Sequence, residues 1–228
     1  MQAHYFQHVP FEGLGSMEPW LIERGYSIGR TRLFAGDPLP DLNSLDLLIV
    51  MGGPMSVNDE ATLPWLVDEM AFIRQAIEAG IPVLGVCLGA QLIAKCMGGT
   101  ISTNPEREIG WFRCEGISHG DEAFDFPESF EAFHWHGETF SLPDGAIHLA
   151  RSEACEHQAF QLGERIIGLQ FHLETTPDSS SALIEHCADE LIDAPFVQSA
   201  DNMHAVSEER YSALNHLMAQ ILDYLTRP

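Results

Sequence analysis

The chain has 228 residues, of which 45% are hydrophobic and 20% charged, and its formal net charge at pH 7 is −23. A chain of this size can bury a substantial core, and it contains no apolar run near the ~20 residues of a membrane helix. The 11 basic residues form no cluster of the kind that binds phosphate backbones, which makes nucleic acid a poor partner. The acidity is more typical of a soluble surface than of a specific function.

Five cysteines, at positions 87, 96, 114, 155 and 187, are widely spaced and form no C-x-x-C pair. This spacing favours reduced thiols over a disulfide framework or a structural zinc site. The N-terminal segment MQAHYFQHVPFEG lacks the basic region and long apolar core of a secretory signal. We therefore expect a cytoplasmic protein. Because neither a repeat nor a linker-like stretch interrupts the sequence, we expect a single domain over residues 1–228.

Short β-prone segments alternate with helical patterns through the first half of the chain. The segments 45–51 and 83–86 are almost continuously apolar, as expected for strands covered on both faces. Pro64 suits the first turn of a helix and Gly80 its end. The pattern predicts strands at 4–8, 32–34, 45–51 and 83–86 and helices at 17–24 and 64–79. Such alternation is typical of an α/β fold, a mostly parallel central sheet with helices on both faces.

From about Ile109 the pattern changes to short strands separated by turns. These strands, expected to add to the main sheet in antiparallel fashion, are 110–116, 131–137, 146–152, 157–162 and 165–172. Residues 178–228 have apolar positions at helical spacing and are predicted to form a mainly helical C-terminal extension. We expect the apolar side of this extension to cover the sheet, with a dimer face as the alternative.

Cys87 occupies a sharp turn between a predicted strand and a predicted helix, within Gly85-Val86-Cys87-Leu88-Gly89. A buried cysteine can be merely a small hydrophobic residue. The G-x-nucleophile-x-G pattern, however, is typical of an elbow that exposes a reactive atom at the carboxyl end of a sheet. A Cβ on either glycine would crowd the neighbouring strand or helix. The start of a helix and a nearby histidine would both favour the thiolate, the nucleophilic form.

A nucleophile of this kind needs a general base, and His172 is the strongest candidate. It lies in Gly168-Leu169-Gln170-Phe171-His172-Leu173-Glu174, at the end of a predicted strand. On an extended segment His172 and Glu174 emerge on the same side, so that the carboxylate can orient the imidazole and stabilise its charged form.

A third motif, Met51-Gly52-Gly53-Pro54, follows another buried strand. Two glycines there let backbone N–H groups approach a ligand closely. The N–H groups of Gly53 and of Leu88, the residue after the nucleophile, could form an oxyanion hole; an ordinary turn is the alternative.

Together these three motifs resemble the class I, or triad-type, glutamine amidotransferases. HWHGE at 134–138 and REIGW at 107–111 add weaker support, and the motifs span most of the first 175 residues in the family's order. Free-standing members similar to the amidotransferase domain of GMP synthase are the nearest match. The resemblance implies a flavodoxin-like three-layer sandwich with extra C-terminal helices.

The resemblance also implies a mechanism. Cys87 would attack the side-chain amide of glutamine, His172 would pass a proton to the departing ammonia, and Glu174 would orient His172. Water would then release glutamate, and the ammonia would be lost or passed to a synthetase partner, since 228 residues leave little room for a synthetase segment. Substrate contacts would come from Gln91 and from the backbone of a loop at His136-Gly137.

Other assignments remain open at this point. A γ-glutamyl hydrolase would use the same chemistry on γ-glutamyl amines or peptides, and a non-catalytic sensor or scaffold could retain the fold. Two residues depart from the family pattern: Leu173 replaces the usual proline, and Glu138 stands where aspartate is frequent. His134 and His136 could share a face and bind a metal. We expect neither a metal site nor a cofactor.

Overall fold

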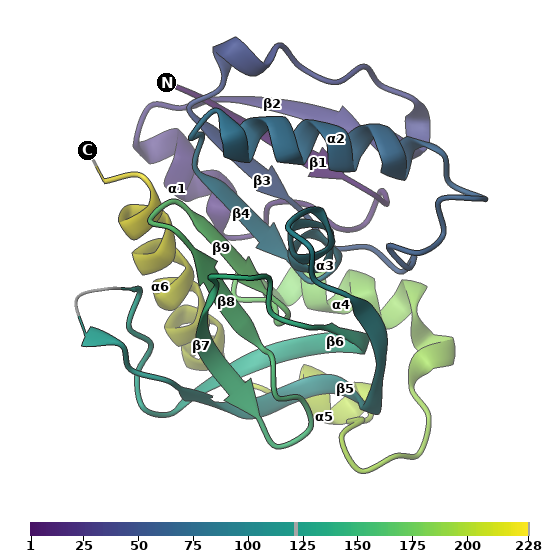
Figure 1. Cartoon of the computed structure of the whole chain (residues 1–228). Helices are drawn as coiled ribbons and strands as arrows, with labels where there is room; N and C mark the ends of the chain where they lie inside the picture. Colours follow the sequence, from purple (N-terminus) through teal and green to yellow (C-terminus); the bar gives the residue numbers. More distant parts are fainter. Residues whose placement is uncertain (121–122, 228) are drawn as a thin grey trace.

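The structure is a computed structural model, and it describes residues 1–120 and 123–227 (Figure 1). In this part of the chain, nine strands form one sheet in the order β2-β1-β3-β4-β9-β8-β7-β5-β6. The strands from β2 to β9 are parallel, and the remaining pairs are antiparallel. The parallel half has the strand order of flavodoxin-like folds. The predicted fold class is confirmed, with antiparallel additions at one edge.

The parallel half contains the strands and helices predicted from the first half of the sequence, with one exception. One predicted strand was misplaced: residues 32–34 lie at the end of β2 and in a short 3₁₀ turn, η1. β2 is an edge strand whose exposed, partly charged residues give no apolar signal. The strands are β1 (Gln2–Gln7), β2 (Ser27–Arg32), β3 (Leu47–Val50), β4 (Val83–Val86) and β9 (Ile166–Leu169); the helices are α1 (Met17–Glu23), α2 (Trp65–Glu78) and α3 (Leu88–Cys96), and the 3₁₀ turns are η1 (Leu33–Ala35) and η2 (Leu42–Ser44).

The antiparallel half is built on a long hairpin. Its first strand begins at Ile101, well before the predicted Gly110, because the pairing register shifts between Thr103 and Glu108 and interrupts the alternation of side chains. That irregular segment lines the pocket described below. The strands are β5 (Ile101–Gly116), β6 (Phe130–Phe140), β7 (Ile147–Ser152) and β8 (Ala159–Leu162).

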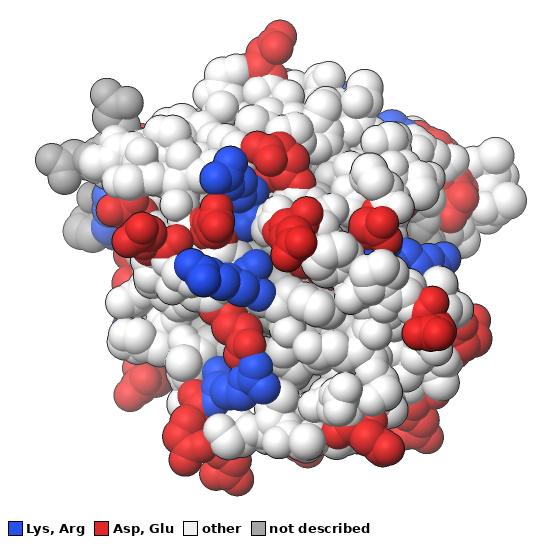
Figure 2. All heavy atoms as spheres, turned by 90° about the horizontal axis from the view of Figure 1, so that it is seen from below, with Lys and Arg blue, Asp and Glu red and all other residues white. Residues whose placement is uncertain are grey.

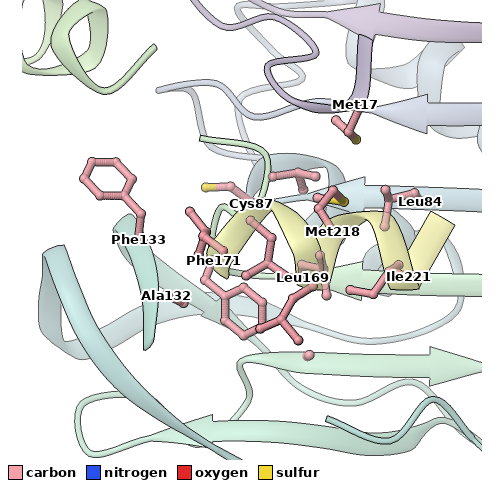
Figure 3. Close-up of a cluster of buried hydrophobic side chains, with 14 of the residues drawn as sticks. Met17, Leu84, Cys87, Ala132, Phe133, Leu169, Phe171, Met218 and Ile221 are labelled. Atoms are coloured by element: carbon pink, nitrogen blue, oxygen red, sulfur yellow. The ribbon is translucent and has the colours of Figure 1, made fainter. Parts of the chain in front are cut away.

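The C-terminal region is mainly helical, as predicted, and its last helix ends at Leu225. It contains α4 (Pro177–His186), the 3₁₀ turn η4 (Ala188–Glu190), α5 (Ala200–His204) and α6 (Glu208–Leu225). Met218 and Ile221 of α6 lie beside Leu169 of β9 and Phe171 (Figure 3). α6 therefore covers the sheet, as expected from its apolar positions.

Two hydrophobic clusters pack against opposite faces of the sheet. Helices α2 and α3, in front of the sheet in Figure 1, bury Leu66, Ile73 and Ile93 in one cluster. Helices α1, α4 and α6 contribute to the other, which includes Cys87 at its margin (Figure 3). The nucleophile candidate therefore rests on closely packed side chains, which hold the elbow rigid.

The surface reflects the acidic composition. On the face shown in Figure 2, Asp and Glu are widespread, and most visible Lys and Arg side chains adjoin acidic ones. Ion pairs of this kind include Arg24–Asp223 at 2.6 Å and Lys95–Glu60 at 2.6 Å. None of the helices described combines the length and apolar character needed to cross a membrane.

Candidate active site

Cys87 stands at the carboxyl end of β4, immediately before α3, in a strained backbone conformation. Its φ of 51° makes it the one non-glycine residue with positive φ in the described chain. A Cβ on Gly85 would lie 2.6 Å from the backbone of Gly89, and one on Gly89 would lie 2.0 Å from the oxygen of Val50. Both glycines are therefore required for the close contact of strand and helix. Strain of this kind is concentrated at functional sites.

His172 and Glu174 lie beside Cys87. The Nδ1 atom of His172 is 2.7 Å from Oε1 of Glu174, and all three residues are buried. The backbone N–H of His172 donates to the carbonyl of Phe133 in β6 at 2.8 Å, which fixes the position of the ring. The structure thus brings together the three residues that the sequence motifs predicted separately.

The charge state of His172 follows from its neighbours. Burial acts to lower the pKa of His172, but the Glu174 carboxylate and a hydrogen bond with Cys87 outweigh it and raise the pKa well above the ordinary value. A protonated imidazole between a carboxylate and a sulfur atom stabilises a thiolate. The arrangement therefore places the His172 imidazole between the Glu174 carboxylate and the sulfur of Cys87.

Gly53 lines the same pocket as Cys87, and Leu88 follows Cys87 in the chain; each carries a backbone N–H group. Within residues 1–120 and 123–227, neither the N–H of Gly53 nor that of Leu88 donates to a backbone carbonyl. No described peptide bond is cis, so the Gly53 N–H points away from the Gly52 carbonyl in the same peptide unit. Both N–H groups remain available to a ligand.

The Gly52 carbonyl is held by a buried ion pair. His8 Nδ1 lies 3.0 Å from the Gly52 oxygen, and His8 Nε2 lies 2.9 Å from Oε1 of Glu69 in α2. Burial acts to lower the pKa of His8, but Glu69 and the Gly52 carbonyl outweigh it and raise the pKa, so both ring nitrogens donate. By holding the carbonyl, His8 fixes the direction of the Gly53 N–H.

These groups meet in a pocket of about 530 Å³. Gln91 of α3 lines it, and its Nε2 donates to Oε1 of Gln170 at 3.1 Å. Gln170 in turn donates to the sulfur of Cys87 at 3.7 Å. Gln91 is thus connected to the nucleophile through one intervening amide, a link that sequence spacing did not indicate.

His136 and Gly137 also line the pocket, but they lie within strand β6 and not in a loop as expected. The opposite strand, β5, changes register here: Thr103 pairs with Glu138 and Glu108 with His136, where a loop was expected from the resemblance. The His136 side chain turns inward, and its Nε2 lies 3.2 Å from Glu108. Only the backbone of this segment is therefore available to a ligand.

Glu108, His134 and His136 form the group most suited to hold a metal, because one ligand atom from each lies within 4.8 Å of the others. Most of their polar atoms are already used in hydrogen bonds, however, and Oε1 of Glu108 is buried without a partner among the described residues. Oε2 of Glu108 accepts from the Ser152 hydroxyl at 3.0 Å and from Gln158 Nε2, and it lies 3.4 Å from Nδ1 of His134. These residues form a buried hydrogen-bond network that joins β5 to β6, to β7 and to Gln158, which directly precedes β8.

Comparison with known proteins gives the family. The sequence model of "Glutamine amidotransferase class-I" matches residues 15–191. A "putative glutamine amidotransferase-like protein YfeJ" of Salmonella typhimurium is 35% identical over 99% of this chain and 98% of its own. The chain belongs to the class I glutamine amidotransferases.

Solved structures agree with this assignment. A glutamine amidotransferase from Methylobacillus flagellatus superimposes with a TM-score of 0.92 at 34% identity, over 98% of this chain and 93% of that chain. One from Thermotoga maritima gives a TM-score of 0.91 at 31% identity, over 100% and 99% of the two chains.

GMP synthases are similar over a smaller part of their length. The GMP synthase of Corynebacterium diphtheriae is 30% identical over 70% of this chain, which corresponds to 32% of that protein. The amidotransferase described here therefore spans about a third of that relative.

Two residues that depart from the amidotransferase pattern are well accommodated. Leu173 is fully buried, and its carbonyl accepts from Asn215 of α6 at 2.9 Å, so packing and a hydrogen bond replace the constraint of proline. Glu138 accepts from the Ser56 hydroxyl at 3.0 Å at the side of the pocket.

Sequence reasoning missed several pocket residues of the amidotransferase, three of which contact the predicted site residues. The Trp135 carbonyl lies 3.6 Å from the sulfur of Cys87, and Arg107 lies against Gly137. Glu12, in the turn between β1 and α1, is buried beside His172. Its position after a buried strand, within a Gly-rich turn, was the one available signal.

Proposed function

We propose that this amidotransferase hydrolyses the side-chain amide of glutamine with Cys87 as nucleophile. The observation that carries the proposal is that Cys87, on a strained elbow, and His172 line one pocket, with Glu174 hydrogen-bonded to His172. Family membership supports glutamine as the substrate, and GMP synthase relatives are named as glutamine-hydrolysing.

In the first step the Cys87 thiolate forms a bond with the amide carbon. The carbonyl oxygen gains negative charge and is stabilised by the N–H groups of Gly53 and Leu88, of which one is typically worth about 2.7–4 kcal/mol. The C–N bond then breaks as His172 transfers its proton to the nitrogen, which leaves as ammonia. Glu174 keeps the imidazole oriented throughout.

In the second step water attacks the γ-glutamyl thioester. His172, now neutral, accepts a proton from the water, the C–S bond breaks, and glutamate leaves with the thiolate restored. Gln91 and the backbone at His136 and Gly137 bind the γ-glutamyl group. The ammonia acceptor, where one is used, is a synthetase partner.

The test is glutamate release from glutamine by the purified protein, compared with a Cys87→Ala variant. We expect turnover that disappears in the variant. Cys96→Ala is the matched control, because burial raises the pKa of that thiol to about 12 and it lies away from the pocket. A Cys87→Ala variant with undiminished turnover would refute the proposal.

A γ-glutamyl hydrolase is the second candidate, because a pocket of about 530 Å³ is large enough for a substrate bigger than glutamine. The same assay with a γ-glutamyl amine separates the two functions. Turnover of the amine alone would assign the protein to that class. Release from neither substrate would favour a non-catalytic role.

A further inference from the structure

Glu12 is a buried carboxyl group that the proposed mechanism leaves unused. It lies between β1 and α1, lines the same pocket as Cys87 and is 8% exposed. Among the described residues, no hydrogen-bond donor contacts either of its carboxylate oxygens, and the influences on its pKa include burial and charges but no hydrogen bond. The Glu12 oxygens are accessible from the pocket, so a ligand there can supply the donor that the described residues do not.

The backbone around Glu12 is fixed. Gln7 Nε2 donates to the carbonyl oxygens of Glu12, at 2.9 Å, and of Pro10, at 3.3 Å. On the other side of the turn, the Phe11 ring stacks on His186 of α4 with 4.5 Å between ring centroids. The turn therefore presents the Glu12 side chain to the pocket in a set position.

That position is next to the catalytic imidazole. A Cβ built on Gly52 would lie 2.2 Å from Oε2 of Glu12 and 3.2 Å from Cε1 of His172, so the two side chains flank the same point. Burial raises the pKa of Glu12 to about 7. His172 and His8 act to lower that pKa, while Glu174 and Glu190 act to raise it.

The place of Glu12 determines which part of a substrate it meets. In the proposed reaction Gln91 and the backbone at His136 and Gly137 bind the γ-glutamyl group. His172 faces the opposite end, because it delivers its proton to the departing nitrogen. A carboxylate beside His172 therefore faces that nitrogen, whose N–H groups are the missing donors.

We propose that Glu12 binds the leaving nitrogen of the substrate by accepting a hydrogen bond from its N–H. This inference rests on the proposed amide hydrolysis. During the first step the Cys87 S–C bond forms, the C–N bond breaks and the proton of His172 moves to the nitrogen; Glu12 exchanges no proton. Because the nitrogen becomes a stronger donor as it is protonated, the contact strengthens toward the transition state.

The proposal defines a specificity. Glutamine carries two N–H groups on the departing nitrogen, an N-alkylated γ-glutamyl amine carries one, and a γ-ester of glutamate carries none on its leaving atom. Glu12 should therefore matter for amides and be dispensable for esters.

The experiment compares wild type and Glu12→Gln on glutamine and on glutamate γ-methyl ester. We expect kcat/KM for glutamine to fall about tenfold in the variant, because the amide oxygen still accepts a hydrogen bond but the charge that strengthens it is lost. The value for the ester should change by less than about threefold or rise, because that leaving atom donates no hydrogen bond. Glu164→Gln is the matched control: it makes the same change at an exposed carboxylate outside the pocket and should leave both values within about twofold.

A thermal melt separates a substrate contact from a structural role. Because no described residue donates a hydrogen bond to the Glu12 carboxylate, the neutral side chain of the Glu12→Gln variant should leave the melting temperature of the protein unchanged or raise it. Equal losses on both substrates, or an unchanged kcat/KM for glutamine, would overturn the inference. Ester turnover by the wild type without glutamine turnover would also overturn it while leaving the Cys87 reaction intact. If the wild type released glutamate from neither substrate, the proposed function would be refuted, and the inference with it.

Discussion

His8 and Glu69 form an ion pair that is fully buried, with 2.9 Å between Nε2 and Oε1. A buried pair of this kind contributes little net stability, because desolvation of both charges offsets their attraction. Its clearest structural effect is on the Gly52 carbonyl, 3.0 Å from His8 Nδ1, and through that peptide unit on the Gly53 N–H. We infer that His8 is a positioning residue for the oxyanion hole.

This role predicts a specific kinetic defect. The test variant replaces both partners, His8→Leu together with Glu69→Leu, because removing one alone would leave a buried unpaired charge at a cost of about 3–5 kcal/mol. We expect kcat for glutamine to fall about 10- to 100-fold, since the Gly53 N–H is no longer aimed, with little change in KM. Steady-state kinetics on the folded double variant measures this, and wild-type kcat would contradict the role.

Short sequence motifs identify some residues of the candidate site and not others. Cys87, His172 and Glu174 could be predicted because each lies in a short motif whose spacing defines its neighbours. Glu12, His8 and Glu69 could not, because the contacts that define them join distant parts of the chain: His8 reaches Gly52 and Glu69 across 44 and 61 positions. Spacing carries no information about such pairs.

At the scale of elements, helix α6 supports the segment that carries His172 and Glu174 from outside the matched family region, which ends at residue 191. Asn215 Nδ2 donates to the carbonyls of Leu173 and Thr175, each at 2.9 Å. These two residues flank Glu174. The helix therefore does more than cover the sheet: it fixes the segment that carries the imidazole and its carboxylate.

Replacement of Asn215 by leucine should expose this dependence. Two buried carbonyls lose their donor, so the free energy of unfolding should fall by about 1–3 kcal/mol. The kcat for glutamine should fall as well, because Glu174 is no longer held in register with His172. Urea unfolding and steady-state kinetics measure the two effects. Gln220→Ala, on an exposed part of α6, is the control, and equal effects in both variants would contradict the assigned role.

Elements were predictable where burial dominates and less so elsewhere. β4 spans the predicted residues 83–86, and α2 lies within one residue of its predicted limits at each end. Both carry a strong apolar pattern. β2 was misplaced because an edge strand needs no apolar pattern, and the start of β5 was missed because its irregular pairing next to the pocket interrupts the alternation.

At the scale of the whole molecule, the candidate site is assembled from turns that follow β1, β3, β4 and β9, so its geometry depends on the entire sheet. Acid unfolding should therefore abolish the site as a unit. His4 in β1 is one group that makes the fold sensitive to acid. Its Nε2 lies 2.9 Å from the Thr31 hydroxyl, which itself donates to the Pro38 carbonyl, so the ring is a neutral donor.

Burial lowers the pKa of His4 from 6.5 to about 4. The unfolded chain therefore binds more protons than the folded protein below pH 6.5, and stability is lost as the pH falls from 6.5 toward 4. Between pH 7 and pH 5 this one residue should cost about 2 kcal/mol of unfolding free energy. Urea denaturation of wild type and His4→Gln at the two pH values isolates the effect, because the glutamine side chain keeps a donor but does not titrate. The variant should lose about 2 kcal/mol less than wild type over this interval, and parallel losses in the two proteins would show that His4 is already protonated in the fold.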